Sequence, residues 1–223
     1  MTYGTTFSAL RKAAGPIWQD YTHHSFVERL GDGTLPQAAF LHYLVQDYLF
    51  LIHFSRAWSL AVAKAGTLDE MRYCAGVVHA LLHEEMQLHV ALCGEAGINA
   101  RQLEQAEERP ENLAYTRYVL DAGYSGDFLD LLTALAPCVL GYGEIGNRLS
   151  HCGETTPYAD WIATYGGAGY QHLCTEVGAL LDTAVAQRIG ADLAASPRWA
   201  ALSKRFTTAT RLEVGFWDMG LDP

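Results

Sequence analysis

The stretch Tyr43-Leu44-Val45-Gln46-Asp47-Tyr48-Leu49-Phe50-Leu51-Ile52-His53-Phe54 decides the fold class of this chain. Its side chains are apolar around most of a helical turn, which is typical of a helix at the centre of a bundle or against another subunit. Apolar residues recur at helical spacing along nearly the whole sequence, and no segment alternates convincingly as a half-buried strand would. We therefore predict an all-α, multi-helix bundle that forms a single domain over residues 1–223.

Glycine and proline divide this apolar pattern into separate helices. The segment Gly31–Pro36 predicts a turn followed by a helix start, whereas Gly66 and Gly97 are expected to end two long helices. A glycine cluster at 166–169 interrupts the pattern again. The predicted helices cover residues 6–24, 36–65, 69–96, 111–122, 126–151, 169–188 and 196–219, with a short helix after Pro157.

Composition and charge exclude several classes of partner. Half of the residues are apolar and 18% are charged, which is enough to build a hydrophobic core without disulfides. The net charge of -10 argues against nucleic acid and against an anionic membrane, and it suits a small neutral or cationic ligand. The first residues, Met1–Thr6, lack the pattern of a secretory signal, and no run approaches the ~18 apolar residues that span a membrane. We expect a cytoplasmic protein.

The cysteines indicate free thiols in a reducing compartment. Their number is odd and no two of them form a CxxC pair, so neither a disulfide framework nor a zinc knuckle is expected. The five are Cys74, Cys93, Cys138, Cys152 and Cys174.

Cys138 is a candidate nucleophile because it follows Pro137 in an apolar helical run. If a helix starts at Pro137, Cys138 lies in the first turn, where unpaired N–H groups favour a thiolate. If one helix continues through, Pro137 removes a hydrogen bond and kinks it. Either geometry puts Cys138, Tyr142 and Ile145 on one face. An isolated cysteine in an apolar helix is otherwise a small buried hydrophobe, and this alternative stays open.

Two acidic residues stand in aromatic surroundings. Asp47 is predicted to share a helical face with Tyr43, Phe50 and Phe54, and Glu213 precedes Phe216 and Trp217 by three and four residues. A buried carboxylate is costly unless it is paired or used in chemistry, so each is either a core acid held by partners or a functional group. A thiol, two acids and many aromatic rings suit a flat heteroaromatic ligand.

Glu144 is a third acid in an apolar helix. It follows Cys138 by six residues, so it projects to a different side of the helix. We expect Glu144 to serve helix packing.

Several separate motifs follow one another along the chain. They are Phe26–Val27, Gly31–Pro36, Gln46–Tyr48, Pro137–Cys138 with Tyr142 and Glu144, Trp161–Gly167, and Glu213–Met219. Together and in this order they make the chain similar to the thiaminase II (TenA) family, whose fold resembles haem oxygenase, over nearly the whole length. The resemblance implies hydrolysis of 4-amino-5-aminomethyl-2-methylpyrimidine to hydroxymethylpyrimidine and ammonia, or cleavage of thiamin to hydroxymethylpyrimidine and thiazole, in a homotetramer without metal or cofactor.

The resemblance also implies a role for each site residue. Cys138 would add to the pyrimidine ring, which requires a ring nitrogen to be protonated or hydrogen-bonded, and Glu213 is the candidate acid. Asp47 would meet the amino group and the neighbouring ring nitrogen. Phe50 stands where some members have a tyrosine, so a hydroxyl near the thiol is lost. The expected substrate-binding residues are Tyr115, Tyr142, Tyr165, Phe50 and Phe216.

Three other functions use residues of the same chain. A non-haem di-iron oxidase could use pairs spaced four apart, although the usual bundle motif spaces Glu and His by three. A haem protein would need an axial histidine such as His23 or His24, which more often cap a helix. A non-catalytic pyrimidine-binding regulator is the third alternative. The di-iron ligands would be Glu85, His89, Glu144, His172 and Glu176.

Overall fold

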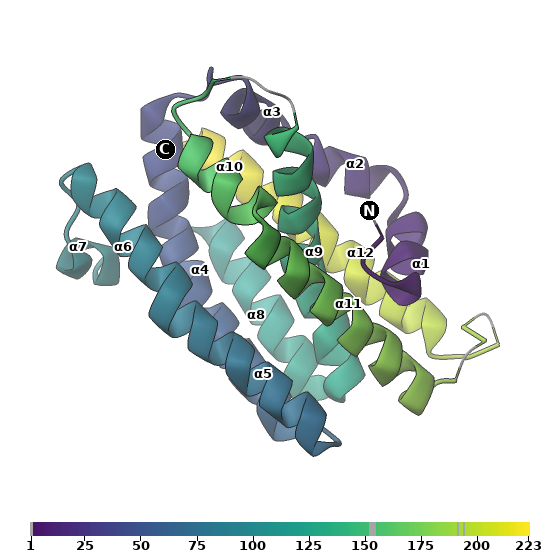
Figure 1. Cartoon of the computed structure of the whole chain (residues 1–223). Helices are drawn as coiled ribbons and strands as arrows, with labels where there is room; N and C mark the ends of the chain where they lie inside the picture. Colours follow the sequence, from purple (N-terminus) through teal and green to yellow (C-terminus); the bar gives the residue numbers. More distant parts are fainter. Residues whose placement is uncertain (1, 152–154, 191, 194) are drawn as a thin grey trace. The chain divides into compact units, whose positions relative to one another are not determined.

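The computed structural model describes residues 2–151, 155–190, 192–193 and 195–223. Within these ranges the chain forms helices joined by turns and short loops, and no strand occurs among them (Figure 1). The predicted all-α class is therefore confirmed.

The helices follow one another along the whole chain. They are α1 Thr5–Ala14, α2 Pro16–Thr22, α3 Ser25–Gly31, α4 Gln37–Lys64, α5 Leu68–Ala80, the π-helical turn η1 Leu81–Glu85, α6 Met86–Glu95, α7 Ala100–Glu104, α8 Pro110–Ser125, α9 Phe128–Ser150, α10 Ala159–Gly166, α11 Ala168–Arg188 and α12 Trp199–Leu221.

The predicted helix over 6–24 is wrong, because the chain breaks it into α1 and α2. Gly15 adopts φ +60°, a left-handed conformation that glycine tolerates best, and Pro16 then opens α2 at the first helical position. The short helices α3 and α7 were not predicted. The run predicted over 69–96 is helical, but η1 interrupts its regular hydrogen-bond pattern.

Two compact units make up the chain. One consists of Met1–Leu35 with Leu132–Trp217, and the other of Pro36–Leu131 with Asp218–Pro223. We call them unit 1 and unit 2. Each unit combines segments that are distant in the sequence, so no single cut separates them, as expected of one domain rather than two in tandem. The domain bounds 1–223 stay a prediction.

In unit 1, α9 crosses the N-terminal helices in a defined order. Glu144 accepts hydrogen bonds from the Arg11 guanidinium at 2.7 Å and from the Trp18 indole at 3.2 Å. One turn later, Arg148 donates to the carbonyl oxygen of Thr22, at the end of α2, at 2.8 Å and forms an ion pair with Glu28 of α3 at 2.9 Å. The helix α9 therefore passes from α1 and α2 toward α3, and Glu144 has the packing role that was predicted for it.

The helix α12 passes the same N-terminal segment in the same direction. Phe206 stacks on Trp18 with ring centroids 5.5 Å apart, and Trp217 stacks on Phe26 at 4.9 Å. These four rings are almost completely buried, and each contributes about 1.5–3 kcal/mol of hydrophobic stabilisation. Within unit 1, the helices α9 and α12 thus run parallel past α1–α3.

In unit 2, α4 is the central helix. Thirteen of its residues are buried, including Tyr43, Asp47, Phe50 and Phe54, as the apolar stretch predicted. The helices α5 and α8 pack against it.

The helix α9 is long and apolar enough to cross a membrane by length and composition, although polar residues interrupt its apolar sequence. However, 83% of its most apolar window is buried inside the protein, as in the core helix of a bundle.

Candidate active site

Cys138 lies in the middle of α9, because the helix continues through Pro137. The alternative in which a helix starts at Pro137 is wrong, so no helix N-terminus favours a thiolate there. Pro137 lacks an N–H group for the helical hydrogen-bond pattern, and its own carbonyl oxygen accepts a hydrogen bond from the Tyr21 hydroxyl at 3.3 Å. Tyr21 can approach so closely because residue 141 is glycine: a Cβ atom there would overlap the Tyr21 ring.

Among the described cysteines, Cys138 is the accessible one. Its side chain is partly exposed, whereas the other three are fully buried, with no exposed surface. Burial raises the pKa of Cys74 to about 12, of Cys93 to about 11 and of Cys174 to about 12, so these thiols stay protonated near neutral pH. Cys138 is therefore not the fully buried small hydrophobe of the alternative interpretation. Cys152 lies outside the described residues.

An aromatic cluster lies one helical turn beyond Cys138. Tyr142 contacts Tyr165 at 4.9 Å and Trp217 at 5.3 Å between ring centroids, and Trp161 contacts Tyr165 at 4.6 Å. All four rings are buried. The cluster joins α9, α10 and α12, and it brings two predicted substrate-binding residues, Tyr142 and Tyr165, into direct contact.

Glu213 is a buried acid of α12. It is 1% exposed and lies one turn before Trp217, just as Cys138 lies one turn before Tyr142. Because α9 and α12 run parallel and the rings of Tyr142 and Trp217 touch, we infer that Cys138 and Glu213 lie on the same side of that contact. Phe216 is buried beside it, with its ring 6.4 Å from that of Trp217.

Asp47, in unit 2, is held by two hydrogen bonds to one oxygen. The Tyr43 hydroxyl donates to Oδ2 at 3.1 Å, and Nε2 of His89 lies 2.6 Å from the same atom. Asp47 and His89 are 4% and 2% exposed. Among the described residues, no hydrogen bond reaches Oδ1 of Asp47.

The two ring nitrogens of His89 both have partners. Nδ1 lies 3.0 Å from the backbone carbonyl oxygen of Glu85, which can only accept, so Nδ1 carries a proton. Burial lowers the pKa of His89, but the hydrogen bond and charge of Asp47, together with Glu85, outweigh burial and raise this pKa to about 9. His89 and Asp47 thus form a buried pair that shares a proton at neutral pH. The sequence offered no signal for it, because 42 residues separate the two side chains.

The two other predicted residues of unit 2 lie together. The rings of Phe50 and Tyr115 are 5.1 Å apart and Phe50 stacks on Phe54 at 5.2 Å. Phe50 and Tyr115 are buried. Of the predicted site residues, Asp47, Phe50 and Tyr115 therefore belong to unit 2, and Cys138, Tyr142, Tyr165, Glu213 and Phe216 belong to unit 1.

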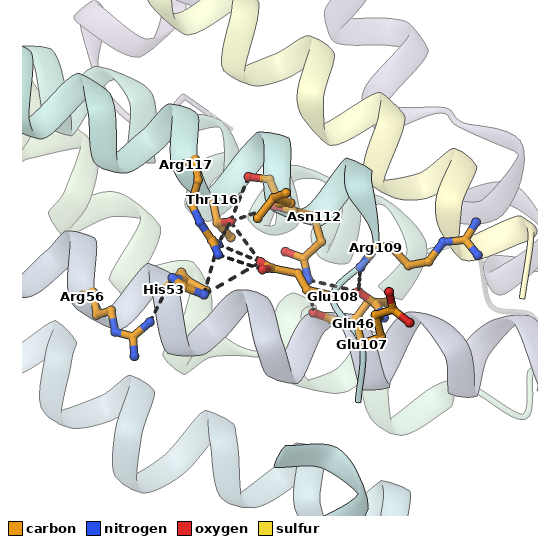
Figure 2. A network of polar contacts seen from close by, with 10 residues as sticks. Gln46, His53, Arg56, Glu107, Glu108, Arg109, Asn112, Thr116 and Arg117 are labelled. Carbon is orange, nitrogen blue, oxygen red and sulfur yellow. Dashed lines mark hydrogen bonds and ion pairs between the residues drawn. The ribbon is translucent and has the colours of Figure 1, made fainter. Parts of the chain in front are cut away.

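Gln46, next to Asp47, ties α4 to the start of α8 (Figure 2). Its amide nitrogen donates to the Glu107 carbonyl oxygen at 2.9 Å, and its amide oxygen accepts from the Arg109 backbone at 3.0 Å. Asn112 donates to the Gln46 backbone carbonyl at 2.8 Å. This network fixes the turn of α4 that carries Asp47, and no pattern in the sequence predicts it.

The same network continues along α4 to a charged group. Figure 2 shows the Glu108 carboxylate facing Arg117 and His53. Arg117 binds both oxygens of Glu108 at 2.9 Å, and it also contacts Nε2 of His53 at 3.1 Å. These contacts connect the loop before α8 to α8 and to α4.

The di-iron interpretation is wrong for the residues it named. Both ring nitrogens of His89 are engaged, and Glu144 is bound to Arg11 and Trp18. His172 and Glu176 form an exposed ion pair at 3.5 Å. In the described part of the chain, no three His, Cys, Asp or Glu side chains form a group that could hold a metal ion.

The proposed axial histidines have structural partners. The ring of His24 accepts a hydrogen bond from the Phe26 backbone and caps α3, while Nδ1 of His23 lies 3.1 Å from Glu28. Both are in the positions that the capping alternative predicted.

Two curated relatives are similar over almost the full length. An uncharacterized protein of Haemophilus influenzae is 40% identical over 96% of this chain and 97% of its own length. An aminopyrimidine aminohydrolase of Halalkalibacterium halodurans is 35% identical over 95% of this chain and 93% of its own.

Solved structures agree with the fold and with the family. A TenA family transcription regulator from Silicibacter sp. TM1040 is 61% identical, with a TM-score of 0.97 over 99% of this chain and 98% of that one. A domain from Shewanella denitrificans with a heme oxygenase-like fold has a TM-score of 0.73 at 12% identity over 97% of this chain and 92% of that one, and it supports the fold alone. The model of the TENA/THI-4/PQQC family matches residues 11–223. The fold is therefore the haem-oxygenase-like helical fold, and the chain belongs to the TENA/THI-4/PQQC family.

Proposed function

We propose that this protein is an aminopyrimidine aminohydrolase of thiamin salvage, a hydrolase acting on a C–N bond. Its reaction would convert 4-amino-5-aminomethyl-2-methylpyrimidine and water to hydroxymethylpyrimidine and ammonia. The observation that carries the proposal is that the accessible thiol Cys138 and the buried acid Glu213 each lie one helical turn before a ring of the same aromatic contact in unit 1, Tyr142 with Trp217. The similarity to a relative named aminopyrimidine aminohydrolase supports it.

In the proposed mechanism, the Cys138 sulfur adds to a carbon of the pyrimidine ring. The displaced electron pair moves to a ring nitrogen, to which Glu213 donates a proton. Ammonia then leaves the protonated aminomethyl group with the C–N bonding pair, water adds at the methylene carbon, and the proton that water loses passes to the released ammonia. Return of the ring proton to Glu213 and departure of the thiolate restore the aromatic ring and the enzyme.

Aromatic rings would hold the substrate by stacking. Tyr142, Tyr165 and Phe216 of unit 1 are proposed for this role, as are Phe50 and Tyr115 of unit 2. Stacking between aromatic rings does not require a charge on the ligand. These side chains would therefore recognise the pyrimidine ring equally well when ammonia leaves and when thiazole leaves.

Asp47 is proposed to accept a hydrogen bond from the exocyclic amino group. Its Oδ2 already serves Tyr43 and His89, whereas Oδ1 has no hydrogen bond among the described residues. A carboxylate oxygen accepts hydrogen bonds from an amino group, so Oδ1 fits this part of the substrate.

Net charge argues against a regulator that binds DNA. The net charge of -10 suits a substrate whose aminomethyl group is protonated, and it opposes DNA binding, which rewards a basic surface. The charge therefore gives no support to DNA binding by this chain, although one similar structure is named a transcription regulator.

We further propose a cytoplasmic homotetramer. Helix α5 carries apolar residues at alternating spacings of three and four, and several are exposed in the single chain: Leu68 is 63% exposed and Met71 38%. In η1 the same stripe continues with Leu82, which is 42% exposed. A second copy of the chain would cover such a stripe. Light scattering tests the tetramer through a mass of four times 24.5 kDa.

An ammonia-release assay on the aminomethylpyrimidine, run beside thiamin cleavage with chelator-treated protein, tests the function. We expect rapid ammonia release, slower thiamin loss, and no turnover by Cys138→Ser. If thiamin is cleaved faster than ammonia is released from the aminomethylpyrimidine, thiamin is the preferred substrate and the protein is chiefly a thiaminase. Tight binding of hydroxymethylpyrimidine with no turnover of either substrate would refute the hydrolase and favour the regulator.

A further inference from the structure

We propose that His89 is a positioning residue for substrate binding, which acts by holding Asp47 with Oδ1 turned toward the substrate amino group. The proposal rests on the proposed function, because it assigns Asp47 to the pyrimidine. It goes beyond that function because it gives a role to His89, which lies on α6 and not on α4 with Asp47. In this proposal His89 does not itself touch the substrate.

The contacts of Asp47 show how its orientation is set. The carboxylate could rotate about its last side-chain bond and offer either oxygen. Both His89 and Tyr43 bind Oδ2, at 2.6 Å and 3.1 Å, so rotation would break two buried hydrogen bonds. A hydrogen bond to a charged group contributes about 1.5–3 kcal/mol, and no bulk water replaces it at a site this buried. Oδ1 is therefore the oxygen left for a ligand.

The ring of His89 is itself fixed at its other nitrogen. Because Nδ1 donates to the Glu85 carbonyl, Nε2 always faces Asp47, and the ring cannot flip without losing both bonds. The single proton shared by Nε2 and Oδ2 keeps the pair neutral overall. A neutral pair allows Asp47 to be buried without leaving a lone charge inside the protein.

The π-helical turn η1 sets the face on which His89 lies. The Met86 backbone N–H donates to the carbonyl of Leu81, five residues earlier, in place of the usual four. One additional residue rotates everything that follows by about 100° about the helix axis. Without η1, the side chain of His89 would point away from α4 and could not reach Asp47.

Two isosteric substitutions separate the contacts of His89. In His89→Gln the amide nitrogen reaches about as far as Nε2 and can donate to Asp47. In His89→Asn the shorter amide occupies the place of Nδ1, so it can reach only the Glu85 carbonyl. We expect His89→Asn to lower kcat/KM for the aminomethylpyrimidine by roughly 10- to 100-fold, the equivalent of one charged hydrogen bond. His89→Gln should retain most of the wild-type value.

The loss should appear in binding, since Asp47 contacts the substrate before and during the reaction. KM and the calorimetric Kd of hydroxymethylpyrimidine should rise in His89→Asn while kcat changes little. A merely structural role would lower the melting temperature of both variants alike and would not separate KM from kcat.

A double-mutant cycle with Asp47→Ala decides whether His89 acts through Asp47. In that background His89→Asn should cause no further loss. If the two losses multiply, or if His89→Gln and His89→Asn are equally impaired, the proposal is wrong. Absence of ammonia release by the wild type would refute the proposed function alone, because the cycle can also be run on the Kd of hydroxymethylpyrimidine. Failure of the wild type to bind that pyrimidine would refute both.

Discussion

Replacing Gly141 by alanine should strongly destabilise unit 1. A Cβ atom at this position would overlap the ring of Tyr21, which has no exposed surface and cannot swing aside. Overpacking of this kind costs about 1–3 kcal/mol. The same substitution at Gly76, in the middle of α5, meets nothing within 4 Å and should stabilise by about 0.5–1 kcal/mol through helix propensity. Gly141 also lies inside a helix, α9, and gains the same propensity, so the two variants should differ by the overpacking cost of about 1–3 kcal/mol in the free energy of unfolding.

Urea denaturation followed by circular dichroism measures both variants against the wild type. Because the Tyr21 hydroxyl donates to the carbonyl of Pro137, Gly141→Ala should also disturb the turn of α9 that carries Cys138 and lower kcat. Gly76→Ala should leave kcat unchanged. A Gly141→Ala protein as stable and as active as Gly76→Ala would refute the reasoning.

The remaining predictions concern titratable groups. Glu213→Gln should lower kcat by about 10²–10⁴-fold and leave the Kd of hydroxymethylpyrimidine within a few-fold of the wild type, as stopped-time assays and calorimetry can check. Glu144→Gln should cost only about 0–1 kcal/mol of stability in thermal denaturation and keep turnover, because its ion pair with Arg11 is partly exposed; a large fall in kcat would contradict its packing role. Folding raises the pKa of His89, so its contribution to stability is complete below about pH 6.5 and is lost as the pH rises toward about 9. The free energy of unfolding of the wild type should therefore fall across that pH range, and that of His89→Gln should fall much less. An identical pH dependence in the two proteins would argue against a shared proton.

The long helices could be predicted from the sequence because their patterns are dense. Residues 36–65 and 126–151 were expected to be helical and form α4 and α9 within two residues at each end. The N-terminal region was not predictable in the same way. Gly15 has a left-handed conformation that depends on how α1 and α2 pack, and the apolar pattern continues across it without interruption.

For the candidate site, the sequence predicted which residues share a face of the same helix. Tyr43 bonds to Asp47, and Tyr142 follows Cys138 by one turn, as helical spacing requires. Contacts between helices gave no such signal. His89 was considered as a metal ligand because Glu85 precedes it by four residues, yet its partner proved to be Asp47, and Glu85 contributes its backbone carbonyl.

The interleaving of the two units has a consequence for evolution and for protein engineering. Residues 36–131 form an uninterrupted segment of unit 2 that carries Asp47, Phe50, Tyr115 and His89, whereas Cys138 and Glu213 belong to unit 1. Recombination at two points in the gene would therefore transplant the proposed amino-group receptor as one cassette and leave the thiol and its acid untouched. Chimaeras that exchange this segment between relatives would combine the proposed amino-group receptor of one protein with the thiol and acid of another. They offer a direct way to change the substrate preference of an enzyme.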